Sequence, residues 1–328
     1  MSMNNKYRIC IICPYFGVLP NYIGLFFQSC KTNYSIDWLI FTDCSYHGYL
    51  PNNVKLIFTS FDDFRERVQA KFDFQISLTS AYKLCDFRPA YGVILNDYLN
   101  GYDYWGHCDL DMIFGDIRKF WTDEVLSKYD KIFTRGHLTL YRNTPIVSKY
   151  YMLPGEGYDY KNVFSNPKSR CFDEMIGINK ILKQRGIQQY SSKGLVADIN
   201  PDRRKFTLSK LIVNDRLINH HYQVFFWENG GVYQSYLASN GQVVNTEVAC
   251  IHFKKRIFPV IQFSITSNVD PFFITPDGFF IKKNQVQNSD FNIYNKGNIW
   301  RDIQNTMLRY YDRVKNKMNK IKREHSLQ

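Results

Sequence analysis

Short apolar runs alternate with helical stretches over the first hundred residues, and this alternation constrains the fold more than any other feature of the chain. The runs at 8–13, 37–42 and 54–59 are typical of buried strands. An amphipathic stretch ending at Cys30 and a charged stretch at 61–72 are spaced as helices. The order strand, helix, strand, strand, helix predicts a layered α/β sheet, with ligand groups at the carboxyl ends of its strands.

Past this region the sequence predicts further helices and then a change to short strands. The expected elements are helices at 89–99, 117–129 and 171–184, and strands at 131–134 and 138–141. From Val224 onward, short β segments separated by Gly-Gly and Asn-Gly turns lead to the apolar run 248–253. The chain therefore combines an α/β part with a β-rich part.

Composition narrows the class of protein. The chain has 328 residues, of which 45% are hydrophobic and 22% charged, so it can bury a large core and is expected to fold. Its apolar runs are far shorter than the roughly 18 residues that span a bilayer, and its first residues lack the apolar core of a signal peptide. Eight dilute cysteines, most of them inside apolar runs, fit a reducing compartment. We therefore expect a cytoplasmic protein.

An Asp-Leu-Asp motif follows an aromatic strand-like run and precedes Met-Ile-Phe-Gly. In extended backbone, residues two apart point to the same side, so Asp109 and Asp111 are placed to hold Mg²⁺ or Mn²⁺ through hard oxygen ligands. The alternative is a solvated turn. Two adjacent carboxylates at the end of a buried strand repel each other unless a cation or hydrogen-bond donors offset them, which favours the metal interpretation.

Two runs, the second of which ends in this motif, resemble a known family. They read Tyr-Lys-Leu-Cys-Asp-Phe-Arg-Pro-Ala-Tyr-Gly from Tyr82 and Gly-Tyr-Asp-Tyr-Trp-Gly-His-Cys-Asp-Leu-Asp up to Asp111. They look like the donor-binding segment of bacterial polysaccharide-locus glycosyltransferases of the GT-A type, in particular a group of capsule and exopolysaccharide proteins described mostly as a domain of unknown function. The resemblance covers about residues 8–255. Further matching segments lie at 14–17, 20–22, 36–43, 71–74, 136–143, 171–174 and 197–201.

The resemblance implies a GT-A-like, Rossmann-type mixed sheet flanked by helices. It also implies a metal-dependent transferase that moves a hexose from a nucleotide-diphosphate sugar, expected to be a UDP-hexose, to a saccharide acceptor in bacterial surface polysaccharide synthesis. Retention of the anomeric configuration is favoured over inversion, and the acceptor is expected to be lipid-linked. Residues 1–258 would form the catalytic domain, with a donor-binding half to about 116 and an acceptor half from 117, followed by a β-rich extension at 259–298 and a basic helix at 299–328.

The same resemblance implies the metal ligands. A Mn²⁺ or Mg²⁺ ion would bridge Asp111 to the donor diphosphate, and Asp109 would join it directly or through the ribose. His252, in the late apolar run, is similar in position to a third ligand of related enzymes, although a histidine on an apolar strand is also typical of a core residue. Lys254 and Lys255 then lie where a diphosphate uses point charges, and their alternative is a solvated basic loop end.

Five further donor-binding residues follow from the resemblance. Asp86 and Arg88 are similar to an Asp-x-x-Arg type pattern of sugar-nucleotide enzymes, although the spacing here is Asp-Phe-Arg. They would bind donor-sugar hydroxyls or pair with one another, and Lys83 is a candidate from the same turn. Tyr15 and Asp43 follow the first two strands, where a base and a ribose normally lie in this fold, and they supply a stacking ring and a hydroxyl acceptor.

The catalytic candidates are Asp173 and Glu174. By resemblance, a carboxylate at this position faces the donor anomeric carbon and the acceptor hydroxyl, as a base in an inverting enzyme or as a stabiliser of an oxocarbenium-like centre in a retaining one. The alternative is that both acids stabilise the dipole of the helix expected to start at 171. His137, after Arg-Gly, is a candidate for acceptor binding only.

The C-terminal stretch predicts an amphipathic basic helix. Apolar residues recur every three to four positions over 303–321, and the segment 310–328 holds six basic and two acidic residues, a net charge of +4. Such a helix would bind the inner leaflet of the membrane peripherally, or pack its apolar stripe on the catalytic domain.

Two other classes of function compete with the transferase. A haloacid-dehalogenase-like phosphatase also places Asp-x-Asp after a strand, but near the start of its domain, whereas three strands precede Asp109 here. A nucleic-acid-binding protein would fit the net charge of +12 and the 17% aromatic content. Because no nucleic-acid motif is present and aromatic residues in apolar runs are mostly core, we expect no nucleic-acid partner.

Overall fold

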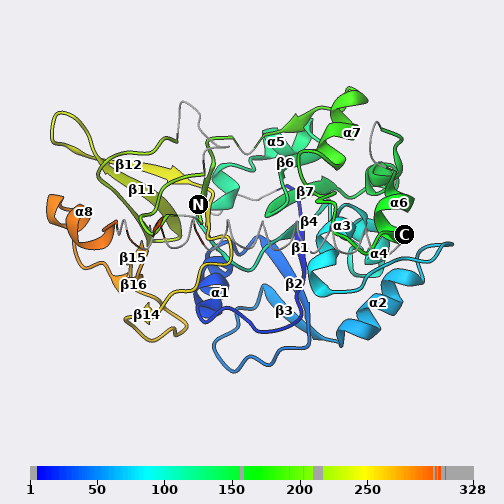
Figure 1. The fold of residues 1–328 in the computed structure, drawn as a ribbon, viewed down its shortest axis with the longest axis horizontal. Helices are drawn as coiled ribbons and strands as arrows, with labels where there is room; N and C mark the ends of the chain where they lie inside the picture. Colours follow the sequence, from blue (N-terminus) through cyan, green and yellow to red (C-terminus); the bar gives the residue numbers. More distant parts are fainter. Residues whose placement is uncertain are drawn as a thin grey trace.

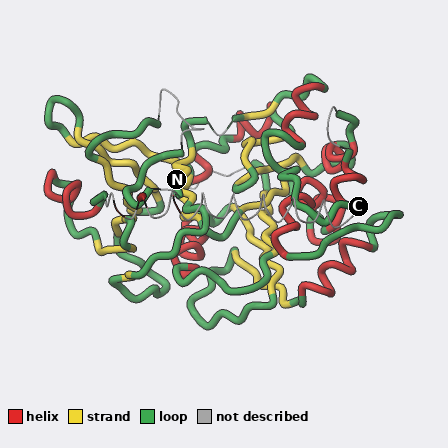
Figure 2. The backbone as a smooth tube through the Cα atoms, viewed as in Figure 1, coloured by secondary structure: helices red, strands yellow, loops and turns green. Residues whose placement is uncertain are grey.

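The computed structural model describes residues 6–155, 159–191, 193–201, 203–209 and 217–297, together with residues 300, 302, 303 and 307. The predicted basic helix at 299–328 therefore lies almost entirely outside the described residues. Figure 1 shows two regions side by side, a helix-flanked sheet and a β-rich lobe. Most of the helical segments lie around the helix-flanked sheet (Figure 2). In the described part of the chain, no helix is both long and apolar enough to cross a membrane.

The helix-flanked region is built on a mixed sheet. Its described strands, in spatial order, are β3 (Val54–Phe58), β2 (Ile36–Thr42), β1 (Ile9–Pro14), β4 (Tyr104–Cys108), β7 (Leu138–Arg142), β6 (Lys131–Arg135) and β8 (Gln189–Tyr190). The first four strands are parallel, and β7 runs antiparallel to both β4 and β6. The parallel half contains the first three predicted strands, each within two residues of the expected ends.

Strand β1 shows why both faces of this sheet are covered. Its odd-numbered residues pack in one buried cluster with α1 (Ile23–Thr32), and its even-numbered residues pack in a second cluster with α2 (Phe61–Gln69). Alternate residues of a strand face opposite sides, so an unbroken apolar run marks a strand that is buried on both faces. The predicted α/β fold, a mixed sheet flanked by helices, is confirmed.

Two further sheets form the rest of the molecule. A small sheet pairs β5 (Met112–Phe114), β13 (Cys250–His252) and β9 (Val196–Asp198). A larger one has, in spatial order, β12 (Val243–Val248), β11 (Gly231–Leu237), β10 (Gln223–Glu228), β15 (Phe272–Thr275), β16 (Gly278–Ile281) and β14 (Val260–Ile261). Strands from both sides of the expected boundary at 258 share this larger sheet, and α8 (Asn288–Tyr294) packs against β10 through Phe291.

The prediction of one continuous helix over 89–99 is wrong. The chain instead makes a series of short helical turns, which are η1 (Ala81–Lys83), α3 (Leu84–Phe87), η2 (Arg88–Ala90), α4 (Tyr91–Ile94) and η3 (Asn96–Tyr98). Pro89 lies within this series, where its missing N–H interrupts a continuous α-helix. Gly92 packs so closely on β4 that an added Cβ would lie 2.5 Å from the Trp105 indole. Contact with the sheet therefore overrides helical spacing here.

Two other predicted helices are only partly correct. The stretch 117–129 divides into η4 (Ile117–Lys119) and α5 (Asp123–Lys128), because Thr122 caps α5 by accepting a hydrogen bond from the Val125 N–H at 3.2 Å. Of the stretch 171–184, only α7 (Ile178–Gln184) is helical. Residues before it form a tight turn in which an added Cβ on Gly177 would collide with the Phe172 carbonyl. The remaining described helices are η5 (Val147–Met152) and α6 (Tyr160–Ser165).

Candidate active site

Strand pairing brings three acidic residues and a histidine together. Asp109 and Asp111 lie between β4 and β5, where the chain leaves the main sheet for the small one. His252, the last residue of β13, pairs with Met112 on β5 and with Asp198 at the end of β9. The register of the small sheet therefore places His252 between the Asp-x-Asp motif and Asp198. We call Asp109, Asp111, Asp198 and His252 the metal-side cluster.

Each carboxylate of the motif has one oxygen held by the protein and one facing His252. Asp111 Oδ1 lies 3.4 Å from His252 Nε2, and Asp109 Oδ2 lies 3.6 Å from the same nitrogen. The other oxygen of Asp111 accepts the Lys255 backbone N–H, and the other oxygen of Asp109 accepts a hydrogen bond from Arg88 Nη2. Three ligand atoms thus converge within 4.8 Å of one another.

Asp198 fixes the orientation of the histidine. Its Oδ1 lies 2.8 Å from His252 Nδ1, and its Oδ2 lies 2.7 Å from Lys254 Nζ. A carboxylate on the second ring nitrogen is the usual partner of a metal-binding histidine. Sequence reasoning missed Asp198 as a functional residue. Its signals were its place in the matching segment 197–201 and at the end of the short apolar run Leu195–Val196–Ala197, and neither predicts that this run pairs with β13.

The electrostatics of the cluster favour a cation. Burial alone would lower the pKa of His252, but Asp111, Asp198 and Asp109 raise that pKa to about 10. Burial likewise opposes ionisation of Asp198, yet His252, His137 and Lys254 lower its pKa to about 2. The two carboxylate oxygens and the one ring nitrogen that converge here are ligand types that suit Mn²⁺ or Mg²⁺. The residues present fit such an ion.

His137 stacks on His252. The ring centroids are 4.5 Å apart with the planes inclined by 25°, and the His137 carbonyl accepts the Asp109 N–H at 2.9 Å. Burial and then the neighbouring His252 lower the pKa of His137, and its Nε2 has no hydrogen-bond partner among the described residues. The candidate acceptor-binding histidine therefore lies against the metal-side cluster, with only 5% of its surface exposed.

Arg88 connects the metal-side cluster to the catalytic candidates. Its Nη1 donates to Asp173 Oδ2 at 2.8 Å and to the Gly136 carbonyl at 2.9 Å, while its Nη2 contacts Asp109. Burial raises the pKa of Asp173 to about 7; Arg88 opposes this and Glu174 adds to it. Asp173 is thus a buried acid that the Arg88 guanidinium links to Asp109.

Gly136 allows Asp173 and Glu174 to approach the site together. A Cβ on this glycine would lie 2.5 Å from Asp173 Oδ2 and 2.9 Å from Glu174 Oε1. Both acids sit in the turn before α7 and not in its first turn, so the helix-dipole interpretation of this pair is wrong.

Lys83 and Asp86 are enclosed by protein. They pair at 2.6 Å with side-chain exposures of 1% and 0%. Lys83 also donates to the carbonyls of Val163 and Lys168, and Asp86 accepts the backbone N–H groups of Arg170 and Phe172 at 2.8 Å each. The Lys83–Asp86 pair therefore holds the segment 168–172, which precedes Asp173, in place.

Four donor-binding candidates remain, two that follow parallel strands and two that follow β13. Tyr15 follows β1 and donates to the Val18 carbonyl at 2.6 Å, and Asp43, exposed after β2, accepts the Gly17 N–H at 3.1 Å. Both are at carboxyl ends of parallel strands, as expected. Lys254 and Lys255 have φ values of 52° and 62°, a left-handed pair that aims the Lys255 N–H at Asp111.

Comparison with known proteins gives a family and a set of distant structures. The model of a protein family described as a family of unknown function, DUF6625, matches residues 11–285. The chain belongs to this family. The curated proteins contain no match to this DUF6625 chain.

Three solved structures similar to the DUF6625 chain are glycosyltransferases by title. Galactosyltransferase LgtC with donor and acceptor sugar analogues is 11% identical and covers 58% of this chain and 75% of its own, with a TM-score of 0.32. An active-site mutant of LgtC is 11% identical over 75% of this chain and 87% of its own, with a TM-score of 0.36. Mouse xyloside xylosyltransferase 1, without ligand, is 9% identical over 59% and 88%, with a TM-score of 0.34. Likenesses at these TM-scores carry no argument about function, which rests on the site geometry.

Proposed function

We propose that this DUF6625 chain is a metal-dependent glycosyltransferase that moves a hexose from a nucleotide-diphosphate sugar to a saccharide acceptor. The observation that supports it most is the convergence of Asp109, Asp111 and His252 within 4.8 Å, with Asp198 orienting the histidine. A site of two carboxylates and one oriented imidazole suits a divalent cation, and a divalent cation is the usual partner of a diphosphate.

Asp109 Oδ2, Asp111 Oδ1 and His252 Nε2 would hold the Mn²⁺ or Mg²⁺ ion. Bound there, the ion supplies charge stabilisation for the leaving nucleoside diphosphate. Lys255 supplies its backbone N–H to Asp111, and its ammonium lies 4.4 Å from the centroid of the exposed Tyr82 ring. Lys255 and Tyr82 would thus present a cation and an aromatic surface to the donor.

Arg88 links the metal-side cluster to the carboxylate pair Asp173 and Glu174. It holds Asp109 with one nitrogen and Asp173 with the other, so the carboxylate pair at 173–174 stays beside the donor side of the site. In a retaining reaction, which we favour, a carboxylate here would stabilise positive charge developing at the anomeric carbon. Asp173 is the buried member and Glu174 the more accessible one, which makes Glu174 the better placed to contact a sugar.

The finer assignments belong to the same proposal. We propose a UDP-hexose as donor, with Tyr15 and Asp43 beside the base and ribose, and a lipid-linked saccharide of bacterial surface polysaccharide synthesis as acceptor. The enzyme would work at the cytoplasmic face of the membrane. The phosphatase alternative gains no support from the described residues, because Arg88 and His252 already face the two oxygens of Asp109, the carboxylate that would act as its nucleophile.

Calorimetry with UDP-glucose and UDP-galactose, with and without Mn²⁺, tests the proposal. We expect binding and slow hydrolysis of at least one donor that depend on Mn²⁺ and are lost in excess chelator. The matched control is Asp62→Asn, which changes an exposed carboxylate that pairs with Arg65 on α2. Full donor turnover in excess chelator would refute the metal-dependent transferase.

A further inference from the structure

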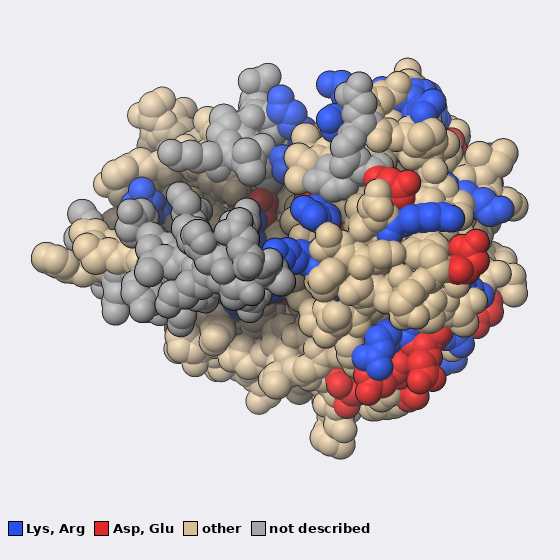
Figure 3. Space-filling model, turned by 45° about the vertical axis from the view of Figure 1, so that its right-hand side comes forward, with Lys and Arg blue, Asp and Glu red and all other residues tan. Residues whose placement is uncertain are grey.

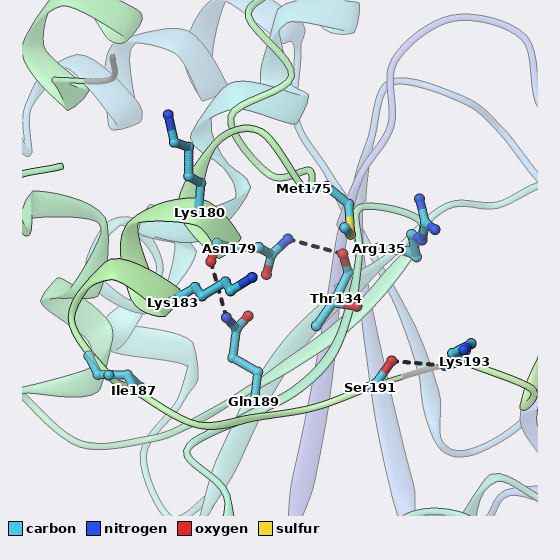
Figure 4. A pocket seen from close by; sticks show the side chains of 11 residues that line it. Thr134, Arg135, Met175, Asn179, Lys180, Lys183, Ile187, Gln189, Ser191 and Lys193 are labelled. Carbon is cyan, nitrogen blue, oxygen red and sulfur yellow. Dashed lines mark hydrogen bonds between the residues drawn. The ribbon is translucent and has the colours of Figure 1, made fainter. Parts of the chain in front are cut away.

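A pocket of about 880 Å³ opens next to the catalytic candidates. Thr134 and Arg135 line it and lead directly into Gly136, against which Asp173 and Glu174 pack. Met175, the residue after Glu174, lines it as well. Figure 4 shows this arrangement, with α7 on one side and the end of β6 on the other. A ligand in the pocket would therefore lie beside the carboxylate pair.

The pocket is positively charged. Arg135, Lys180, Lys183 and Lys193 line it, and none of its described lining residues is acidic. Figure 4 shows Lys183 reaching across toward Thr134 and Gln189, whereas Lys180 points away from them. Lys and Arg side chains also colour the upper edge of the face drawn in Figure 3, where α7 lies. Lys183 is thus a cation that reaches into a concave site, where it would attract an anionic ligand.

The pocket also holds two unused hydrogen-bond acceptors. Asn179 is 6% exposed and donates through Nδ2 to the Thr134 carbonyl at 3.0 Å, while Gln189 donates through Nε2 to the Asn179 carbonyl at 3.2 Å. The buried oxygens Asn179 Oδ1 and Gln189 Oε1 have no hydrogen-bond partner among the described residues. Buried polar atoms are normally satisfied, and hydroxyl groups of a ligand would satisfy these two.

We infer that this pocket is the acceptor subsite and that it selects an anionic saccharide, one that carries a phosphate or a carboxylate. The inference rests on the proposed transferase function and names the class of its acceptor. Lys183 meets the anionic group, and the amide oxygens of Asn179 and Gln189 accept sugar hydroxyls. A volume of about 880 Å³ accommodates a saccharide of more than one ring.

Binding of model sugars to the full-length chain tests this inference without donor or metal. Calorimetry in chelator would compare glucose 6-phosphate and glucuronate with glucose and inorganic phosphate. We expect at least one of the two acids to bind at least fivefold more tightly than both glucose and phosphate, and the better of them identifies the anionic group as phosphate or carboxylate. Equal binding of glucose, equal binding of inorganic phosphate, or no binding of either acid would overturn the inference.

Two variants connect the binding to the pocket. Lys183→Gln should weaken binding of the anionic sugar about tenfold, because a charged hydrogen bond is lost. Lys55→Gln, an equal charge change on the exposed face of β3, should leave it unchanged. Gln189→Met should weaken all sugars several-fold and inorganic phosphate not at all. Equal effects of the two lysine variants would refute the pocket assignment.

The transferase and the subsite can fail separately. Turnover of a UDP-hexose with Mn²⁺ by the unaltered chain is measured in parallel. Anionic sugars that bind to a chain without turnover would refute the transferase and leave the binding site in place. Transfer to the anionic sugars at equal rates by the Lys183→Gln and unaltered chains would refute the subsite and leave the transferase in place.

Discussion

The metal-side cluster and the basic pocket are neighbours built in opposite ways. Asp111, Asp198 and His252 are each less than a tenth exposed and are positioned by the paired strands of the small sheet. Lys180, Lys183 and Lys193 are exposed and come from α7 and a loop. Strand register holds side chains rigidly, which suits a charge-stabilising centre, whereas exposed cations can change without disturbing the core. The proposed reaction chemistry and the proposed acceptor choice are therefore assigned to separate parts of this fold.

The largest effect is expected from a change in the metal-side cluster alone. Asp111→Asn should lower Mn²⁺-dependent donor turnover roughly 100- to 1000-fold, because one ligand charge is lost. Its melting temperature should change little, since the amide oxygen can still accept the Lys255 N–H. Kinetics with a UDP-hexose and a thermal melt check both expectations. Wild-type turnover in this variant would remove Asp111 from the metal site.

The carboxylate pair lies between the two regions and should show the next largest effect. Removing the functional carboxylate, by Asp173→Ala or Glu174→Ala, should lower kcat about 100-fold with little change in donor affinity, because the interaction develops mainly in the transition state. Glu124→Gln, on the exposed surface of α5, is the control. If both alanine variants keep wild-type turnover, neither acid is catalytic.

Asp198→Asn tests whether metal binding by the metal-side cluster depends on the carboxylate that orients His252. We expect Mn²⁺ affinity to fall roughly 10- to 100-fold, because the ring loses the carboxylate that orients it. Electron paramagnetic resonance of Mn²⁺ titrations measures this without turnover. Unchanged affinity would make Asp198 a structural partner of Lys254 only.

Stability against pH sharpens the role assigned to Asp173. Its pKa is raised to about 7, so between pH 4 and 7 the folded chain holds a proton that the unfolded chain releases. Stability from this group is therefore present at low pH and is lost as pH rises through 7. Asp173→Asn places an uncharged amide at this position at both pH values. The free energy of unfolding of this variant, relative to that of wild type, should therefore increase by about 2 kcal/mol from pH 5 to pH 8. Denaturant titrations at the two pH values that show no such increase would contradict the raised pKa.

The sequence predicted the α/β core well because both faces of its strands are apolar and the helix spacing is regular. It failed where contacts with distant residues decide the local structure. The turns around Pro89 and Gly92 follow from packing on Trp105, and the turn before α7 follows from the closeness of Gly177 to Phe172. Such contacts leave no periodic signal in the sequence.

The candidate site was predictable to a similar degree. Asp109 and Asp111 are two positions apart in sequence, so their proximity follows from local geometry. His252 came from family resemblance, and Asp198 was missed because it meets His252 only through the pairing of β9 with β13. The bridge from Arg88 to Asp173 spans 85 positions and likewise has no local signature.

The smallest expected effect concerns the C-terminal tail. Residues 312–328 lie outside the described residues, and their sequence predicts a basic amphipathic stretch. Basic residues near an anionic bilayer contribute roughly 1 kcal/mol each, so deleting the residues after Tyr311 should lower sedimentation with anionic vesicles several-fold while donor hydrolysis stays intact. Added salt should release the full-length chain from the same vesicles, because screening weakens this attraction. Equal vesicle binding by the truncated and full-length chains would leave the tail as a structural element that packs on the domain.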